Sequence, residues 1–91
     1  MKLRKTESTQ TEDGWVDLLE SYGHVWFLLD GVLYFVFPEG PHKYGFCRWE
    51  GPEGPNVPER EFNSEEEFLN AKLFGGKSIL ERLDDVLCYD P

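Results

Sequence analysis

The chain has 91 residues, enough for one small domain at most. Hydrophobic residues make up 40% of it, so a small core can form, and 18 acidic residues against 9 Lys and Arg give a formal net charge of −9. That charge argues against a nucleic-acid binder, which must neutralise phosphates, and against binding to an anionic membrane surface. No apolar run approaches the roughly 20 residues of a membrane span.

The first segment of the chain, residues 1–13, is polar and carries three early cations. A secretory signal would place an apolar stretch after those cations, and none follows here. We therefore expect residues 1–13 to be a disordered N-terminal tail, residues 14–91 to be a single α+β domain, and the protein to be cytoplasmic.

A short helix is expected directly after this tail. Apolar residues recur with helical spacing from Trp15 to Tyr22, with polar residues between them, which predicts a helix over about residues 14–22. Asp13 is the expected N-cap, and Gly23 is the expected left-handed residue that ends the helix.

The most informative segment is a predicted β-hairpin. Two β-rich runs flank Asp30-Gly31, a dipeptide that suits both positive-φ positions of a type I′ turn. This turn sets the register, with Leu29 opposite Val32 and the pairing continuing outward. Both faces of this hairpin are apolar, whereas a half-buried hairpin alternates apolar with polar residues. Either helices cover both faces, or another molecule covers one of them.

The sequence leaves open which hairpin face is exposed to solvent. We assign one face to the core and treat the other as a candidate self-association face. The expected core consists of Trp15, Leu19, Trp26, Leu28, Leu33, Phe35, Phe46, Phe68, Leu80 and Leu83. The candidate self-association face consists of Val25, Phe27, Tyr34 and Val36.

The segment after the hairpin predicts more strand and turn structure. Residues 44–49 read as a third strand, and residues 59–62 as a short fourth strand or extended chain at a sheet edge. The tetrapeptide Pro-Glu-Gly-Pro occurs at residues 38–41 and 52–55, and both copies are typical of reverse turns.

The last third of the chain predicts helices. Ser64 and Ser78 each have a Glu three residues later, the pattern of a capping box, and apolar residues with helical spacing follow. We expect two short helices there, with residues 88–91 trailing off. The predicted fold class is α+β: a short N-terminal helix, a three- or four-stranded antiparallel meander, and two short C-terminal helices.

Chemistry-bearing residues are few. The chain has as many histidines and cysteines as the four ligands of a structural zinc site: His24, His42, Cys47 and Cys88. They lack the closely spaced ligand pairs that such sites usually have. The sequence also shows no pattern that would bring a nucleophile, a general base and an orienting group into one catalytic site. We expect reduced, buried thiols, with a disulfide between them as the open alternative, and no catalytic residues, metal or cofactor.

An acidic stretch of five Glu and one Arg runs from residue 59 to residue 67. One interpretation is a solvated sheet edge and a charged helix start. The other is a surface that docks a basic protein, because surface acids raise the association rate with such partners. The candidate partner-binding residues are Glu59, Glu61, Glu65, Glu66 and Glu67.

Residues 62–83 resemble a family of small bacterial domains of unknown function. The resemblance rests on a Phe-x-Ser-x-Glu-Glu helix start, an apolar pair, and a Gly-Lys-Ser-Leu segment before a last helix, with Ile79 here in place of the Leu. Some such proteins lie near phage or toxin–immunity loci. The resemblance implies a bacterial origin and an inhibitor or immunity role, and it supplies no catalytic residues.

The sequence therefore favours a non-enzymatic, acidic protein-binding domain, such as an inhibitor or immunity protein for a basic partner. The alternative is a homo-oligomeric structural or assembly subunit of phage or bacterial origin, for which the two-sided hairpin would form a homodimer contact. A small metal-dependent or hydrolytic enzyme is the third and least supported hypothesis. No nucleic-acid or membrane partner is expected.

Overall fold

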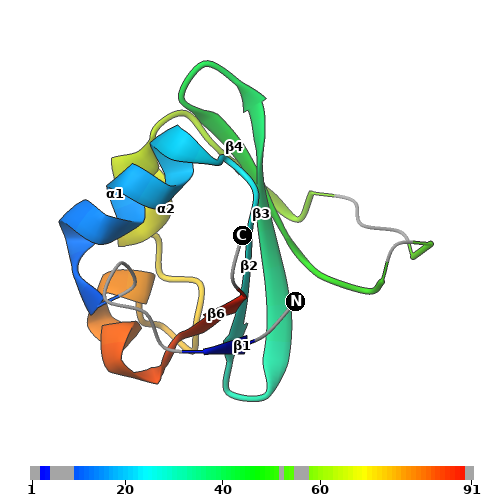
Figure 1. Ribbon diagram of the computed structural model, residues 1–91, viewed down its shortest axis with the longest axis vertical. Helices are drawn as coiled ribbons and strands as arrows, with labels where there is room; N and C mark the ends of the chain where they lie inside the picture. Colours follow the sequence, from blue (N-terminus) through cyan, green and yellow to red (C-terminus); the bar gives the residue numbers. More distant parts are fainter. Residues whose placement is uncertain (1–2, 5–9, 52, 55–57, 90–91) are drawn as a thin grey trace.

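The computed structural model describes residues 3–4, 10–51, 53–54 and 58–89, and shows an α+β protein (Figure 1). Its helices are α1 (Glu12–Ser21), α2 (Glu65–Asn70) and a 3-10 helix, η2 (Ile79–Asp85). The strands are β1 (Leu3–Arg4), β2 (Val25–Leu29), β3 (Val32–Gly40), β4 (Lys43–Arg48), β5 (Arg60–Phe62) and β6 (Leu87–Tyr89). They form one sheet in the order β1-β6-β2-β3-β4-β5, and each neighbouring pair is antiparallel.

The hairpin of β2 and β3 is confirmed in both turn and register. Asp30 and Gly31 have φ angles of 53° and 79°, as a type I′ turn requires. Leu29 pairs with Val32, and the pairing continues in step to the far end of β2. The local chemistry of one dipeptide therefore aligns the two central strands.

Helix α1 starts earlier than the sequence predicts. Its N-cap is Thr11, whose hydroxyl accepts a hydrogen bond from the Gly14 amide at 3.0 Å, so Asp13 lies inside the first turn instead of capping it. Gly23 has φ of 77° and follows the helix as expected. Within residues 1–13, expected as a tail, the structure has β1 and the start of α1; residues 1–2 and 5–9 lie outside the described residues.

The C-terminal region contains the two expected short helices and one unexpected strand. The Ser64 hydroxyl accepts from the Glu67 amide at 3.1 Å, and the Glu81 carboxylate accepts from the Ser78 amide at 3.0 Å, so both helix starts are capped. The expectation that the chain trails off from Cys88 is wrong, because Leu87–Tyr89 forms β6 and pairs with β2.

The middle of the chain follows the predicted meander. Residues 60–62 form β5, which pairs with β4 and lies at the sheet edge. The first Pro-Glu-Gly-Pro copy belongs mostly to β3, and the turn lies one step later, at Pro41 and His42. Part of the second copy, residues 52 and 55, lies outside the described residues.

The core lies between the helices and the hairpin face that the sequence analysis assigned to self-association. Val25, Phe27 and Val36 are at most 5% exposed, and Tyr34 packs against them. Of the expected core, Trp15, Leu19, Phe46 and Phe68 are buried, and Leu80 and Leu83 are partly buried against them. The remaining four, all from the hairpin, lie on the other face: Trp26, Leu28, Leu33 and Phe35. The alternation of strand residues was predicted correctly, but the choice of face was wrong.

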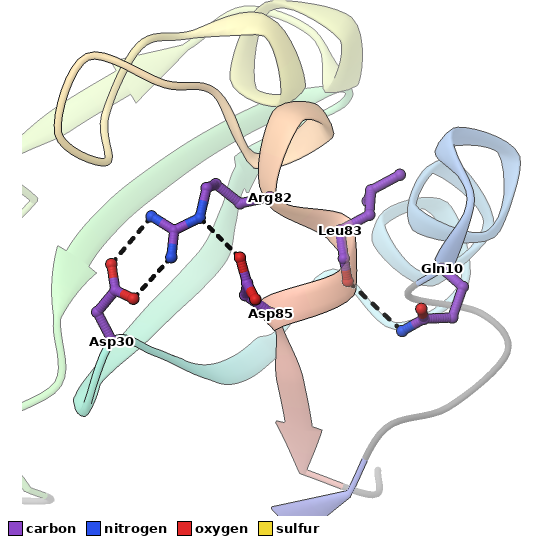
Figure 2. A network of polar contacts seen from close by, with 5 residues as sticks. All are labelled: Gln10, Asp30, Arg82, Leu83 and Asp85. Carbon is purple, nitrogen blue, oxygen red and sulfur yellow. Dashed lines mark hydrogen bonds and ion pairs between the residues drawn. The ribbon is translucent and has the colours of Figure 1, made fainter.

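A charged contact joins the hairpin turn to η2. Arg82 donates to both carboxylate oxygens of Asp30, at 2.9 and 2.6 Å, and to Asp85 at 3.0 Å (Figure 2). Such paired hydrogen bonds fix orientation as well as distance. No helix in the described part of the chain is long and apolar enough to cross a membrane.

Candidate functional site

Among the described residues, no helix lies over one face of the sheet. Helices α1, α2 and η2 all lie on the same side, and residues 49–51 leave β4 on the other side (Figure 1). We call the uncovered side the open face. It consists of His24, Trp26 and Leu28 on or next to β2, Leu33, Phe35 and Phe37 on β3, and Trp49 just after β4. His24 is exposed and the other six are partly buried. Two further residues lie on this side of the sheet: Leu87, the partner of Leu28, is partly buried, and Cys47, the partner of Phe35, is only 1% exposed. No described helix covers this apolar surface, and it is only partly exposed.

The aromatic rings of the open face stack on one another. Trp26 and Phe35, which are cross-strand partners, have ring centroids 4.6 Å apart and planes 19° apart. Phe37 stacks on Phe35 at 5.1 Å, and His24 lies within 6.4 Å of Trp26. The stacked rings stand on neighbouring positions of the sheet and contact one another. The result is a continuous ridge of aromatic side chains.

Trp49 continues this ridge beyond the end of β4. Its amide donates to the Leu33 carbonyl at 2.9 Å, which extends the pairing of β3 and β4 by one residue. Its ring meets Phe35 at 5.1 Å and Trp26 at 5.8 Å, both at steep angles. The sequence analysis placed Trp49 at the end of a strand but not in a site; the register of β4 on β3 is the signal that could have done so.

Acidic side chains flank the open face at the β5 edge. Glu61 pairs with Gly45, the residue over which Phe37 lies, so Glu61 is on the open side of β5. Glu39 approaches the same glycine from the end of β3. A hollow of about 220 Å³ lies beside them, and its charged lining residues are Glu39, Glu61 and Lys43. Two carboxylates and one ammonium group leave this hollow with a negative formal charge. Glu39 is a site residue that the sequence analysis missed.

The five predicted acidic residues differ in their exposure and in their contacts. Glu59, Glu61, Glu66 and Glu67 are exposed, and the Glu59 carboxylate accepts from the Arg48 amide at 3.1 Å. Glu65 is only 8% exposed, and its carboxylate lies 3.0 Å from His42 Nδ1, so its inclusion in an exposed acidic surface is wrong. In the first turn of α2, this position faces the β3–β4 turn rather than solvent.

The cysteines have little nucleophilic character. Cys47 and Cys88 are free and buried, as expected. Burial raises the pKa of Cys88 to about 12 and also raises the pKa of Cys47. Because the thiolate is the reactive form, neither thiol is activated. Among the described residues, no group of three or more His, Cys, Asp or Glu side chains is placed to hold a metal ion.

Comparisons with family models, with curated proteins and with solved structures find no match to this chain. The candidate site is therefore defined by geometry: a ridge of stacked aromatic side chains on a sheet face that no described helix covers, with carboxylates at one edge.

Proposed function

We propose that the chain is a non-enzymatic protein-binding domain whose open face receives a basic protein, in the manner of an inhibitor or immunity protein. The observation that carries this proposal is the ridge of partly exposed aromatic side chains on a sheet face that no described helix covers. Large aromatic residues are enriched in the centres of protein interfaces, where they provide most of the binding energy.

The ring geometry favours a protein over a sugar or a nucleobase. Those ligands bind by stacking on an exposed ring face. Here Phe35 stacks with Trp26 and with Phe37, and Trp49 packs at a steep angle against Trp26 and Phe35, so neighbouring rings already occupy part of the ring surface that such ligands would use. Such a packed aromatic surface suits contact with aliphatic and aromatic side chains of a second protein.

Charge favours a basic partner over a second copy of this chain. The net charge is −9, and Glu39 and Glu61 stand beside the ridge. A two-fold contact between two open faces would bring two highly acidic surfaces together, at a cost in repulsion. A basic protein would turn the same carboxylates into attractive contacts that speed association.

A capture experiment with matched variants tests this proposal. The wild-type chain, Trp26→Ser, Phe35→Ser and Val32→Ser would each be immobilised, exposed to cell lysate at low salt and eluted with a salt step. Val32→Ser is the control because Val32 is also partly buried on β3 but points to the helix side of the sheet. We expect the wild type and Val32→Ser to retain a basic protein that both open-face variants lose. The salt step should release this protein, because salt screens the attraction between exposed charges that lie farther apart than the Debye length, roughly 10 Å at 0.1 M.

Circular dichroism of each variant would establish that it is folded. Retention of the same proteins by the open-face variants would refute the proposal. Light scattering at high protein concentration tests the alternative, a homo-oligomeric assembly subunit. A dimer mass that Trp26→Ser abolishes would make a second copy the occupant of the open face and would overturn the basic-partner proposal.

A further inference from the structure

A second hollow lies on the helix side of the sheet, at the end where β3 turns into β4. It has a volume of about 450 Å³, and its walls come from the last turn of α1 with the residues after it, and from the β3–β4 turn. Figure 1 shows these two segments at the same end of the molecule. We call this hollow the end pocket. It shares no residue with the open face.

The α1 side of the end pocket presents negative charge and hydrogen-bond acceptors. The C-terminal carbonyls of a helix carry partial negative charge, and the last turn of α1 has no basic residue to offset it. Glu20 adds a carboxylate to the lining, and Ser21 adds a hydroxyl. The Tyr44 hydroxyl donates to the Leu19 carbonyl at 3.3 Å, and burial, with Glu65 nearby, raises the pKa of Tyr44 to about 12, so this hydroxyl stays neutral.

The β3–β4 side adds a held imidazole. His42 has a φ of 58°, a left-handed conformation that is uncommon for a residue other than glycine. Its Nδ1 lies 3.0 Å from the Glu65 carboxylate, and because a carboxylate only accepts, this nitrogen carries the proton. A buried carboxylate thus holds both the strained turn and the imidazole in place.

The pocket has apolar walls as well as acceptors. Tyr22 is 56% exposed at its mouth, and Pro38 and Pro41 form the opposite side. An exposed aromatic ring beside a negative site suits a cation through the electrons of its face. No Lys or Arg is among the described residues that line the pocket.

We propose that the end pocket binds a single guanidinium or ammonium group carried on an apolar stem. Such a group donates several hydrogen bonds and accepts none, which matches a lining that holds the Glu20 carboxylate, the Ser21 hydroxyl and the negative C-terminal end of α1. The stem would pack against Tyr22 and the two prolines, as long basic side chains do on apolar surface. The inference is independent of the proposed role of the open face.

The test uses small probes on the whole chain at a neutral pH. Nα-acetyl-arginine methylamide would be titrated into the labelled protein, with amide chemical shifts as the readout, beside the citrulline analogue, which has nearly the same shape and no charge. We expect saturable shifts at residues around the pocket for the arginine compound, in the millimolar range typical of one small group. Agmatine, a free guanidinium amine, distinguishes the source: tighter binding of blocked arginine indicates a protein side chain, and tighter binding of agmatine indicates a small amine.

Two variants tie the binding to the pocket. Glu20→Gln should weaken the arginine compound by about twofold to fivefold, the range of one partly exposed ion pair. Glu12→Gln is the control, because Glu12 is an exposed acid at the other end of the same helix, and it should leave binding unchanged. Equal binding of the citrulline analogue, an unaffected Glu20→Gln variant, or no saturation with the arginine compound would each overturn the inference.

Discussion

Gly45 leaves room for the Phe37 ring where that ring crosses β4 on the open face. A Cβ atom at position 45 would lie 2.5 Å from Phe37 Cζ and 2.9 Å from Glu39 Oε1, closer than such contacts occur. We predict that Gly45→Ala lowers the free energy of unfolding by about 1–3 kcal/mol, the usual cost of adding a methyl group to a filled site. Urea unfolding, followed by circular dichroism, measures the loss.

Gly40→Ala is the matched control, because a Cβ there meets nothing closer than Lys43 Cδ at 3.8 Å. Its unfolding free energy should stay within about 0.5 kcal/mol of the wild type, as at most surface positions. Combining Gly45→Ala with Phe37→Ala removes the ring and should make the glycine substitution less costly than it is alone. Equal losses for the two single glycine variants would show that the ring does not crowd this strand.

The contact between η2 and the hairpin turn has a pH signature. The hydrogen bonds from Arg82 hold the pKa of Asp30 below its ordinary value of 3.8. A carboxyl group with a lowered pKa stabilises the fold above the unfolded pKa, and that stability is lost as pH falls through the folded pKa. We predict that Arg82→Gln lowers the urea midpoint at neutral pH, and that its difference from the wild type shrinks below pH 3.8.

Lys77→Gln is the control for this prediction, because it removes one positive charge from an exposed position just before η2. Its difference from the wild type should be smaller than that of Arg82→Gln at neutral pH. Changing Arg82 is cleaner than changing Asp30, since Asn itself favours the left-handed turn position. If the urea midpoint of Arg82→Gln stays below that of the wild type by the same amount at acidic pH, the contact with Asp30 is not the cause of the lost stability.

The elements that the sequence predicted best are those set by local chemistry. Asp30-Gly31 determines a turn, and the turn determines the register of two strands. Strand β6 was missed because Leu87 continues the apolar pattern of the preceding helix, while its partner β2 lies far earlier in the chain. Pairing between distant segments leaves no such local signal.

The candidate site was half predictable for the same reason. Two apolar hairpin faces indicated that either helices cover both or another molecule covers one, but period-two alternation does not say which face would lack a helix. Similarly, Glu65, Glu66 and Glu67 are identical as letters, and only the packing of α2 against the β3–β4 turn buries the first of them. Tertiary packing decided both outcomes.

Charge is the property of the whole molecule that both proposals use. A net charge of −9 on 91 residues repels itself in the folded state, and it also attracts cations to the open face and the end pocket. These two consequences have the same origin, so evidence for the repulsion supports the electrostatic part of both proposals.

We predict that added sodium chloride stabilises the fold, because salt reduces the Debye length to roughly 10 Å at 0.1 M and so screens repulsion across the molecule. The urea midpoint should rise between low ionic strength and about 0.1 M salt. Asp17→Lys with Asp84→Lys, both at exposed positions, adds two charges at each site, takes the net charge from −9 to −5, and should weaken this response.

A charge-conserving pair separates repulsion from the loss of particular side chains. Asp17→Lys with Lys77→Asp adds two charges and removes two, which leaves the net charge at −9, and it should keep most of the wild-type response to salt. A wild-type midpoint that falls with salt would mean that local ion pairs such as Asp30–Arg82 outweigh the repulsion. The acidic surface would then be balanced within the fold, and its attraction for a basic partner or a bound cation would be correspondingly weaker.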